Sequence, residues 1–209
     1  MSGLPEPTEP NDALDDPRMA DLDADPALAT AVLEIESHLA TEGWDQPARL
    51  YALVDTARLA AEEPALSAAL GLDAPAEAGS LTAVEQEHLD PAVPIEDVLT
   101  GITWPPGVDG CAAMVERLVL PPGSDAELPD DPDDQLAAAR EHPDRQEVRI
   151  VAGVTRGGAT YCALRMRSHD DDASVVGSID LVPGLLGLLS ATLDDDETEP
   201  ARGPLEENP

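Results

Sequence analysis

Residues 147–167 read EVRIVAGVTRGGATYCALRMR and predict the β-hairpin on which the rest of the fold depends. A loop of three residues, Arg156, Gly157 and Gly158, places the apolar side chains of both strands on one face. Because strand side chains alternate, a slip of one residue moves all of them to the opposite face. A glycine at the end of the loop also accepts the positive φ that such loops require. The apolar face comprises Val148, Ile150, Ala152, Val154, Thr160, Cys162, Leu164 and Met166.

The opposite face of this hairpin carries charge. In the same register Glu147 faces Arg167, and Arg149 faces Arg165. Two like charges directly opposite each other are unfavourable. We therefore expect a carboxylate or a bound anion beside the two arginines.

The other segments alternate between helical and strand patterns. The clearest is a helix over residues 26–42, with Asp25 as N-cap, Pro26 at the first position and Gly43 at its end. Further predicted helices are an Ala-rich segment to Leu70 that Pro64 interrupts, and residues 95–99, 135–141 and 181–193. Predicted strands cover residues 49–55, 81–89, 111–120 and 175–179.

This order of elements predicts an α+β fold with a mainly antiparallel sheet and helices packed on one face. The other face of the sheet is expected to be partly open. One domain should cover residues 26–193. The segments 1–25 and 194–209 are acidic and poor in apolar residues, the first also rich in proline, so both are expected to be disordered tails.

Composition limits the partners. The chain has 44 acidic residues against 11 basic ones, all arginine, and a net charge of −33. Such a charge argues against nucleic acid and against anionic membrane surfaces as partners. The N-terminus lacks a basic segment followed by an apolar run. The most apolar stretch, residues 181–193, is shorter than the roughly 20 residues that span a bilayer. We expect a cytoplasmic protein.

No motif specifies a reaction, a cofactor or a metal. The four histidines lie in separate segments without zinc-ligand spacing. The run His169-Asp170-Asp171-Asp172 could hold a divalent cation, but adjacent acids on a turn are more typical of a solvated loop. Cys111 and Cys162 fall in predicted strands, which favours reduced core thiols over a disulfide. We therefore predict no catalytic residue and no cofactor.

The candidate binding residues are the arginines of the outward hairpin face. Arg149, Arg165 and Arg167 share that face, and Arg117 lies on the neighbouring strand. One interpretation is a site for an anion or an acidic peptide. The other, which we favour, is a set of surface ion pairs with Glu116, Glu147 or the chain's own acidic loops.

Two tryptophans and the last helix are further candidates. Trp44 and Trp104 each stand beside a proline-containing turn, so they could flank a partner groove or fill the ends of the core. The helix over residues 181–193 is apolar on nearly all sides, and such a helix is either buried against the sheet or used for binding.

Several segments together resemble an uncharacterised family of small acidic actinobacterial proteins. They are GWDQP at 43–47, RLYALVDTARLAAEEP at 49–64, ITWPPGVDGCAAMVERLVLPP at 102–122, the hairpin, and DLVPGLLGLLSATL at 180–193. The resemblance covers about residues 27–193 and implies a cytoplasmic bacterial setting, with no catalytic residue to transfer. The element order is also loosely similar to secretion-chaperone-type folds, which bind polypeptides over a sheet and helix surface.

Two hypotheses about function follow. The first is a non-enzymatic, chaperone- or adaptor-like interaction domain, which associates with itself or with a protein partner through the last helix or the open sheet face. The second is a small-molecule anion sensor or enzyme that uses the arginine-lined face.

Overall fold

The computed structural model describes residues 24–72, 76–87, 89–121, 123–124, 129 and 131–194. Its helices are α2 (Pro26–Glu42), α3 (Thr56–Glu62), α4 (Pro64–Ala69), α5 (Ile95–Thr100), α6 (Pro132–Glu141) and α7 (Pro183–Leu193). Its strands are β1 (Arg49–Asp55), β2 (Leu81–Glu85), β3 (Gly110–Val119), β4 (Gln146–Thr155), β5 (Thr160–Met166) and β6 (Val176–Ser178). The predicted tails lie outside the described residues, except for Ala24, Asp25 and Asp194.

The six strands form one antiparallel sheet in the order β2-β1-β3-β4-β5-β6. The predicted hairpin is confirmed as β4 and β5, with Arg149 opposite Arg165 and Gly153 opposite Tyr161. Gly158 has φ +83° at the end of the loop, as the three-residue connection requires.

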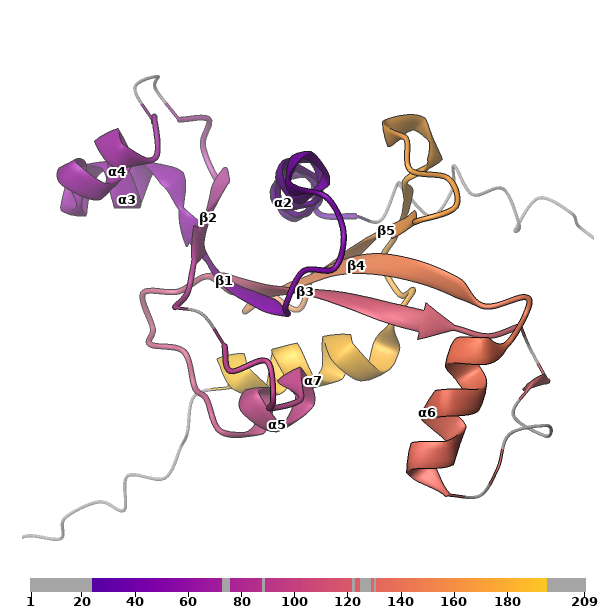
Figure 1. Cartoon of the computed structure of the whole chain (residues 1–209). Coiled ribbons are helices and arrows are strands. Elements are labelled where there is room, and N and C mark those ends of the chain that lie inside the picture. Colours follow the sequence, from indigo (N-terminus) through magenta and orange to yellow (C-terminus); the bar gives the residue numbers. More distant parts are fainter. Residues whose placement is uncertain are drawn as a thin grey trace, which may run out of the picture.

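Helix α2 covers one face of the sheet (Figure 1). Its N-cap is Asp25, whose side chain accepts a hydrogen bond from Leu28 N at 2.9 Å. The apolar stripe of the helix packs on alternate residues of β1, β3, β4 and β5. Gly153 permits close approach, since a Cβ atom there would lie 2.7 Å from Val32 Cγ2.

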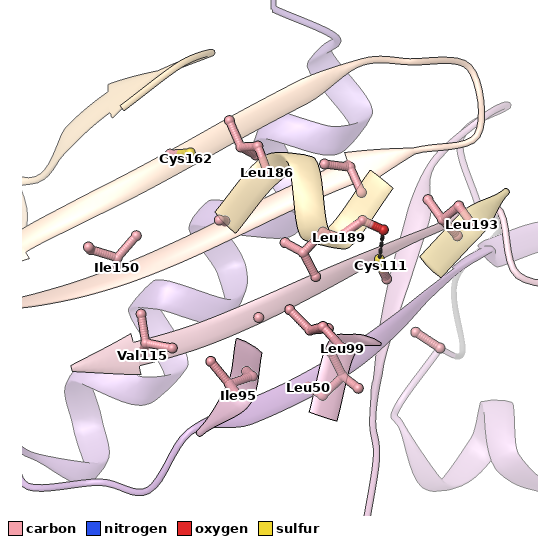
Figure 2. Close-up of a cluster of buried hydrophobic side chains, with 14 of the residues drawn as sticks. Leu50, Ile95, Leu99, Cys111, Val115, Ile150, Cys162, Leu186, Leu189 and Leu193 are labelled. Carbon is pink, nitrogen blue, oxygen red and sulfur yellow. Dashed lines mark hydrogen bonds between the residues drawn. The ribbon is translucent and has the colours of Figure 1, made fainter. Parts of the chain in front are cut away.

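Helices α5 and α7 cover the other face (Figure 1). Figure 2 shows Leu186, Leu189 and Leu193 of α7 above the strands, with Cys111 beneath Leu189. The apolar face predicted for the hairpin points into this second layer. The last helix is therefore part of the core.

The predicted α+β class and antiparallel sheet are confirmed. The expectation that helices pack on one face and leave the other partly open is wrong, because α2 lies on the face opposite α5 and α7. The outward hairpin face that carries Arg149 and Arg165 is the face beneath α2.

Candidate functional site

Two of the three hairpin arginines are buried, whereas the side chain of Arg167 is 41% exposed. Arg149 and Arg165 are 0% and 2% exposed, so the prediction that they lie on an accessible sheet face is wrong. Helix α2 and the turn that follows it cover both side chains. The expected carboxylates beside the opposed pair are nevertheless present. We refer to Arg149, Arg165, Arg167 and the groups bonded to them as the arginine cluster.

Arg165 joins β5 to α2. Its Nε and Nη2 donate to the two carboxylate oxygens of Glu36 at 2.5 and 2.9 Å. Nη2 also donates to Asp172 at 2.8 Å, and Nη1 lies 3.4 Å from Asp170. The hydrogen bond with Glu36, followed by that with Asp172, raises the pKa of the Arg165 guanidinium. A bidentate pair of this kind is among the stronger polar contacts in proteins.

Arg149 joins β4 to β3 and to the end of α2. Its Nε and Nη2 donate to Glu116 at 3.2 and 2.8 Å, and Nη2 also donates to the main-chain oxygen of Gly43. The Trp44 ring lies over the guanidinium, with 4.6 Å between Cζ and the ring centroid. Nη1 makes no hydrogen bond with the described residues.

The turn at residues 43–47 contacts the arginine cluster through Trp44 and Asp45. Arg167 donates to both carboxylate oxygens of Asp45 at 2.9 and 3.0 Å, and to Glu147 at 2.6 Å. Asp45 N donates to Glu116 at 2.8 Å, and Trp44 Nε1 donates to Asp170 at 2.9 Å. Trp44 thus covers arginines of its own chain.

Arg117 and Trp104 lie apart from this cluster. Arg117 forms an exposed ion pair with Glu96 at 2.7 Å. Trp104 is 9% exposed, and its main-chain N–H donates to Thr192 O of α7 at 2.9 Å. The six candidate residues therefore do not form one site.

The geometry of the arginine cluster is typical of ion pairs that stabilise the fold, and not of a site that binds an external anion. Each of Arg149, Arg165 and Arg167 already contacts at least one carboxylate. The interpretation as ion pairs fits this geometry, with the difference that two of the arginines are buried. Reasoning from sequence missed Glu36, although a glutamate beside the apolar stripe of α2 was the available signal.

A groove on the other side of α2 was not predicted. Two hollows of about 530 and about 430 Å³ lie between α2, β2 and the segment after α4. Both are lined by Glu34, Leu72 and Thr82, so they form one continuous surface, which we call the α2–β2 groove. Figure 1 shows α2 and β2, the helix and the strand that contribute lining residues to it.

Tyr51 forms part of the floor of this groove. It is 5% exposed, and its hydroxyl makes no hydrogen bond with the described residues, although the guanidinium of Arg49 lies nearby. Burial, and then the charge of Glu85, raises the pKa of Tyr51 to about 12, against an opposing effect of Arg49. The hydroxyl is therefore neutral at neutral pH.

The strand beside the groove is an edge of the sheet. β2 pairs only with β1 in the strand order. Gln86 N donates to Leu50 O, and Thr56 N donates to Ser80 O. The main-chain N–H and C=O groups of the even-numbered residues of β2 therefore point toward β1. Because antiparallel pairs alternate, the main-chain groups of Leu81, Ala83 and Glu85 face outward.

The two thiols are core groups, as the sequence predicted. Both are unpaired and buried. Burial raises the pKa of each thiol to about 11, and Cys111 Sγ lies 3.6 Å from Leu189 O (Figure 2).

Among the described residues no three His, Cys, Asp or Glu side chains are grouped as a metal site requires. No described helix has the length and apolar character to cross a membrane.

Comparisons with known proteins identify a family for most of the chain. No curated protein and no solved structure matches it. The likeness to secretion chaperones therefore stays a prediction. The model of one protein family matches residues 28–194, which span the sheet and the helices on both of its faces. The chain belongs to the PPA1309-like protein family.

Proposed function

We propose that this protein is a non-enzymatic, adaptor-like interaction domain of the bacterial cytoplasm, and that it binds a protein partner in the α2–β2 groove. The observation that carries the proposal is the strip of sheet that α2 leaves uncovered. Tyr51 and Ala83 line a hollow there beside an edge strand. Edge strands and the grooves beside them are recurrent sites of polypeptide recognition.

The surfaces first considered for binding are occupied. The last helix contributes Leu186, Leu189 and Leu193 to the core, and α2 with the turn after it covers Arg149 and Arg165. The groove instead presents Leu70, which is 41% exposed, next to Leu72. Exposed apolar groups beside a hollow are typical of a contact surface.

The two thiols and the hairpin arginines, which could otherwise take part in catalysis or anion binding, are engaged in contacts within the fold. Cys111 and Cys162 are buried thiols with raised pKa values. The hairpin arginines are neutralised by carboxylates. These contacts support an interaction role over the alternative of an anion sensor or enzyme.

Site-specific photocrosslinking tests the proposal. A photoreactive phenylalanine analogue replaces Leu70 in the groove or, as the matched control, Val119 at the end of β3, which is 45% exposed. We expect irradiation in cytoplasmic extract of the native bacterium to give a discrete crosslinked species from position 70 and none from position 119. Equal labelling from both positions, or none from position 70, contradicts the proposal.

A further inference from the structure

We propose that the α2–β2 groove binds a basic, extended segment of a partner protein, which pairs with the outer edge of β2. This inference rests on the proposed function and specifies the chemistry of the partner. It combines the charge of the groove, its tyrosine floor and the edge strand beside it.

The charge of the groove is negative. Asp25, Glu34, Glu77 and Glu85 line its two hollows, with no arginine among the lining residues. Asp25 is used as a helix cap, but no ion pair of Glu34 or Glu77 is found among the described residues. A groove of one sign attracts a ligand of the other sign and rejects a like-charged one.

The arginine nearest to the groove is already engaged. Arg49 lies 2.5 Å from Glu42 and 3.5 Å from Glu85. The shorter contact holds Arg49 toward the end of α2, which leaves Glu85 with a weak partner. A cation of the partner can therefore approach Glu85 and Glu34 without displacing a strong internal pair.

Tyr51 gives an observation independent of the acidic groups. The hydroxyl of this buried side chain makes no hydrogen bond with the described residues, although the guanidinium of Arg49 lies near it, and the residue lines one hollow together with Glu34 and Glu85. A hollow lined by a tyrosine and two carboxylates is a suitable environment for a guanidinium or ammonium group. The same cation can donate to the phenolic oxygen.

The edge strand determines the form of the partner. Outward main-chain groups of Leu81, Ala83 and Glu85 can pair with an added strand. Every second side chain of that strand then faces the α2 side of the sheet. Leu70 and Leu72 can contact the aliphatic part of a long basic side chain there.

Charge also decides against two other occupants. A second copy of this chain brings a net charge of −33 to an acidic groove. The chain's own N-terminal segment, residues 1–23, contains a single arginine among seven acidic residues. Neither supplies the basic segment that the groove requires, so we assign the groove to a different protein.

Fluorescence anisotropy of the full-length protein tests this assignment. The probe is a short labelled peptide of alternating Arg and Val, and the control peptide alternates Glu and Val. We expect only the basic peptide to bind, with an affinity that decreases as salt is added. Binding of both peptides, of neither, or displacement of the probe by arginine amide as effectively as by unlabelled peptide overturns the assignment.

Matched variants locate the binding. Glu34→Gln with Glu85→Gln should weaken binding roughly tenfold, since two charge contacts are lost. Glu141→Gln with Asp144→Asn, on exposed positions at the end of α6 and in the turn after it, removes the same charge elsewhere and should change the affinity less than about twofold. Equal effects of the two pairs overturn the groove as the site. Circular dichroism verifies that each variant folds.

A proline substitution tests the pairing mode. Ala83→Pro removes an outward N–H from an edge strand, where proline is tolerated. We expect binding of the basic peptide to fall at least about fivefold, the loss of roughly one hydrogen bond. Unchanged affinity overturns strand pairing. If position 70 crosslinks a partner but the basic peptide does not bind, the proposed function stands and this inference fails.

Discussion

Glu36 attaches α2 to β5 through a buried ion pair. Both of its oxygens accept hydrogen bonds from Arg165, and both side chains are almost fully buried. Breaking a buried pair by removing one charge costs about 3–5 kcal/mol. Because Asp172 stays bonded to Arg165, we expect Glu36→Gln to lower the free energy of unfolding by about 3 kcal/mol.

Urea unfolding measures this loss as a lower midpoint with an unchanged slope. The matched control is Glu34→Gln, two residues away on the exposed side of the same helix. It should change the free energy of unfolding by less than about 0.5 kcal/mol. If both substitutions have the same effect, the buried pair does not hold α2 in place.

Asp45 gives a prediction about pH. The hydrogen bond from Arg167 lowers the pKa of the Asp45 carboxyl, against a smaller opposing effect of burial. A folded-state pKa below the unfolded value of about 3.9 means that this group stabilises the fold above that pH. The contribution is lost as the pH falls through the folded-state pKa. Carbon-detected NMR titration should show the lowered pKa in the native protein.

The variant Arg167→Gln should return the pKa of Asp45 to near 3.9, because the donor is gone. Arg117→Gln removes an arginine that pairs with Glu96 elsewhere and should leave Asp45 unchanged. An unaltered pKa of Asp45 in the first variant contradicts the assigned cause.

Sequence periodicity predicted the elements well, because the local signals were strong. Alternation and the two loop glycines fixed the register of β4 and β5, and Asp25 with Pro26 fixed the start of α2. The covering of the arginine face was missed because Arg149 and Arg165 resemble solvent-facing residues. A partner helix from distant sequence neutralises them, and no local pattern reports that contact.

The α2–β2 groove was missed for a related reason. Tyr51 and Ala83 read as ordinary strand residues, and α4 as a helix broken by Pro64. Only the strand order places β2 at the edge and opposite α2. Such an arrangement depends on long-range pairing, which periodicity does not encode.

Gly153 of β4 lies where α2 leaves little space for a side chain on the sheet. A methyl group at this position would lie 2.7 Å from Val32 Cγ2 and 3.1 Å from Leu28 Cδ1. Gly153→Ala therefore displaces α2 or compresses its side chains, and overpacking of this kind costs about 1–3 kcal/mol. We expect thermal unfolding at a lower temperature.

The control for this substitution is Gly157→Ala in the hairpin loop. A Cβ atom there meets only Thr155 Oγ1, at an ordinary 3.6 Å, and its φ is not in the left-handed region. It should leave the unfolding temperature nearly unchanged. Equal stability of the two variants means that α2 has room to move over the sheet.

At the scale of the whole molecule, the two sides of α2 have different surroundings. One side carries Glu36 and is fixed to β5 and the turn at residues 43–47 through the arginine cluster. The other side carries Glu34 and borders the groove. We therefore expect the contacts of Glu36 to keep α2 in position beside the groove, as a preformed binding surface requires.

The net charge of −33 predicts that moderate salt stabilises the fold. Repulsion among so many acidic groups destabilises the folded state, and salt screens it. Raising NaCl from about 10 to about 150 mM shortens the screening length from about 30 to about 8 Å. If this adds about 1 kcal/mol of stability, the unfolding temperature of the full-length protein rises by about 2–4 °C.

KCl at the same ionic strength should give the same rise, because screening does not depend on the identity of the ion. A fall in unfolding temperature would mean that the ion pairs of Arg165 and its neighbours outweigh the general repulsion. Those pairs are mostly buried and little screened, so we expect the repulsion to dominate the salt response.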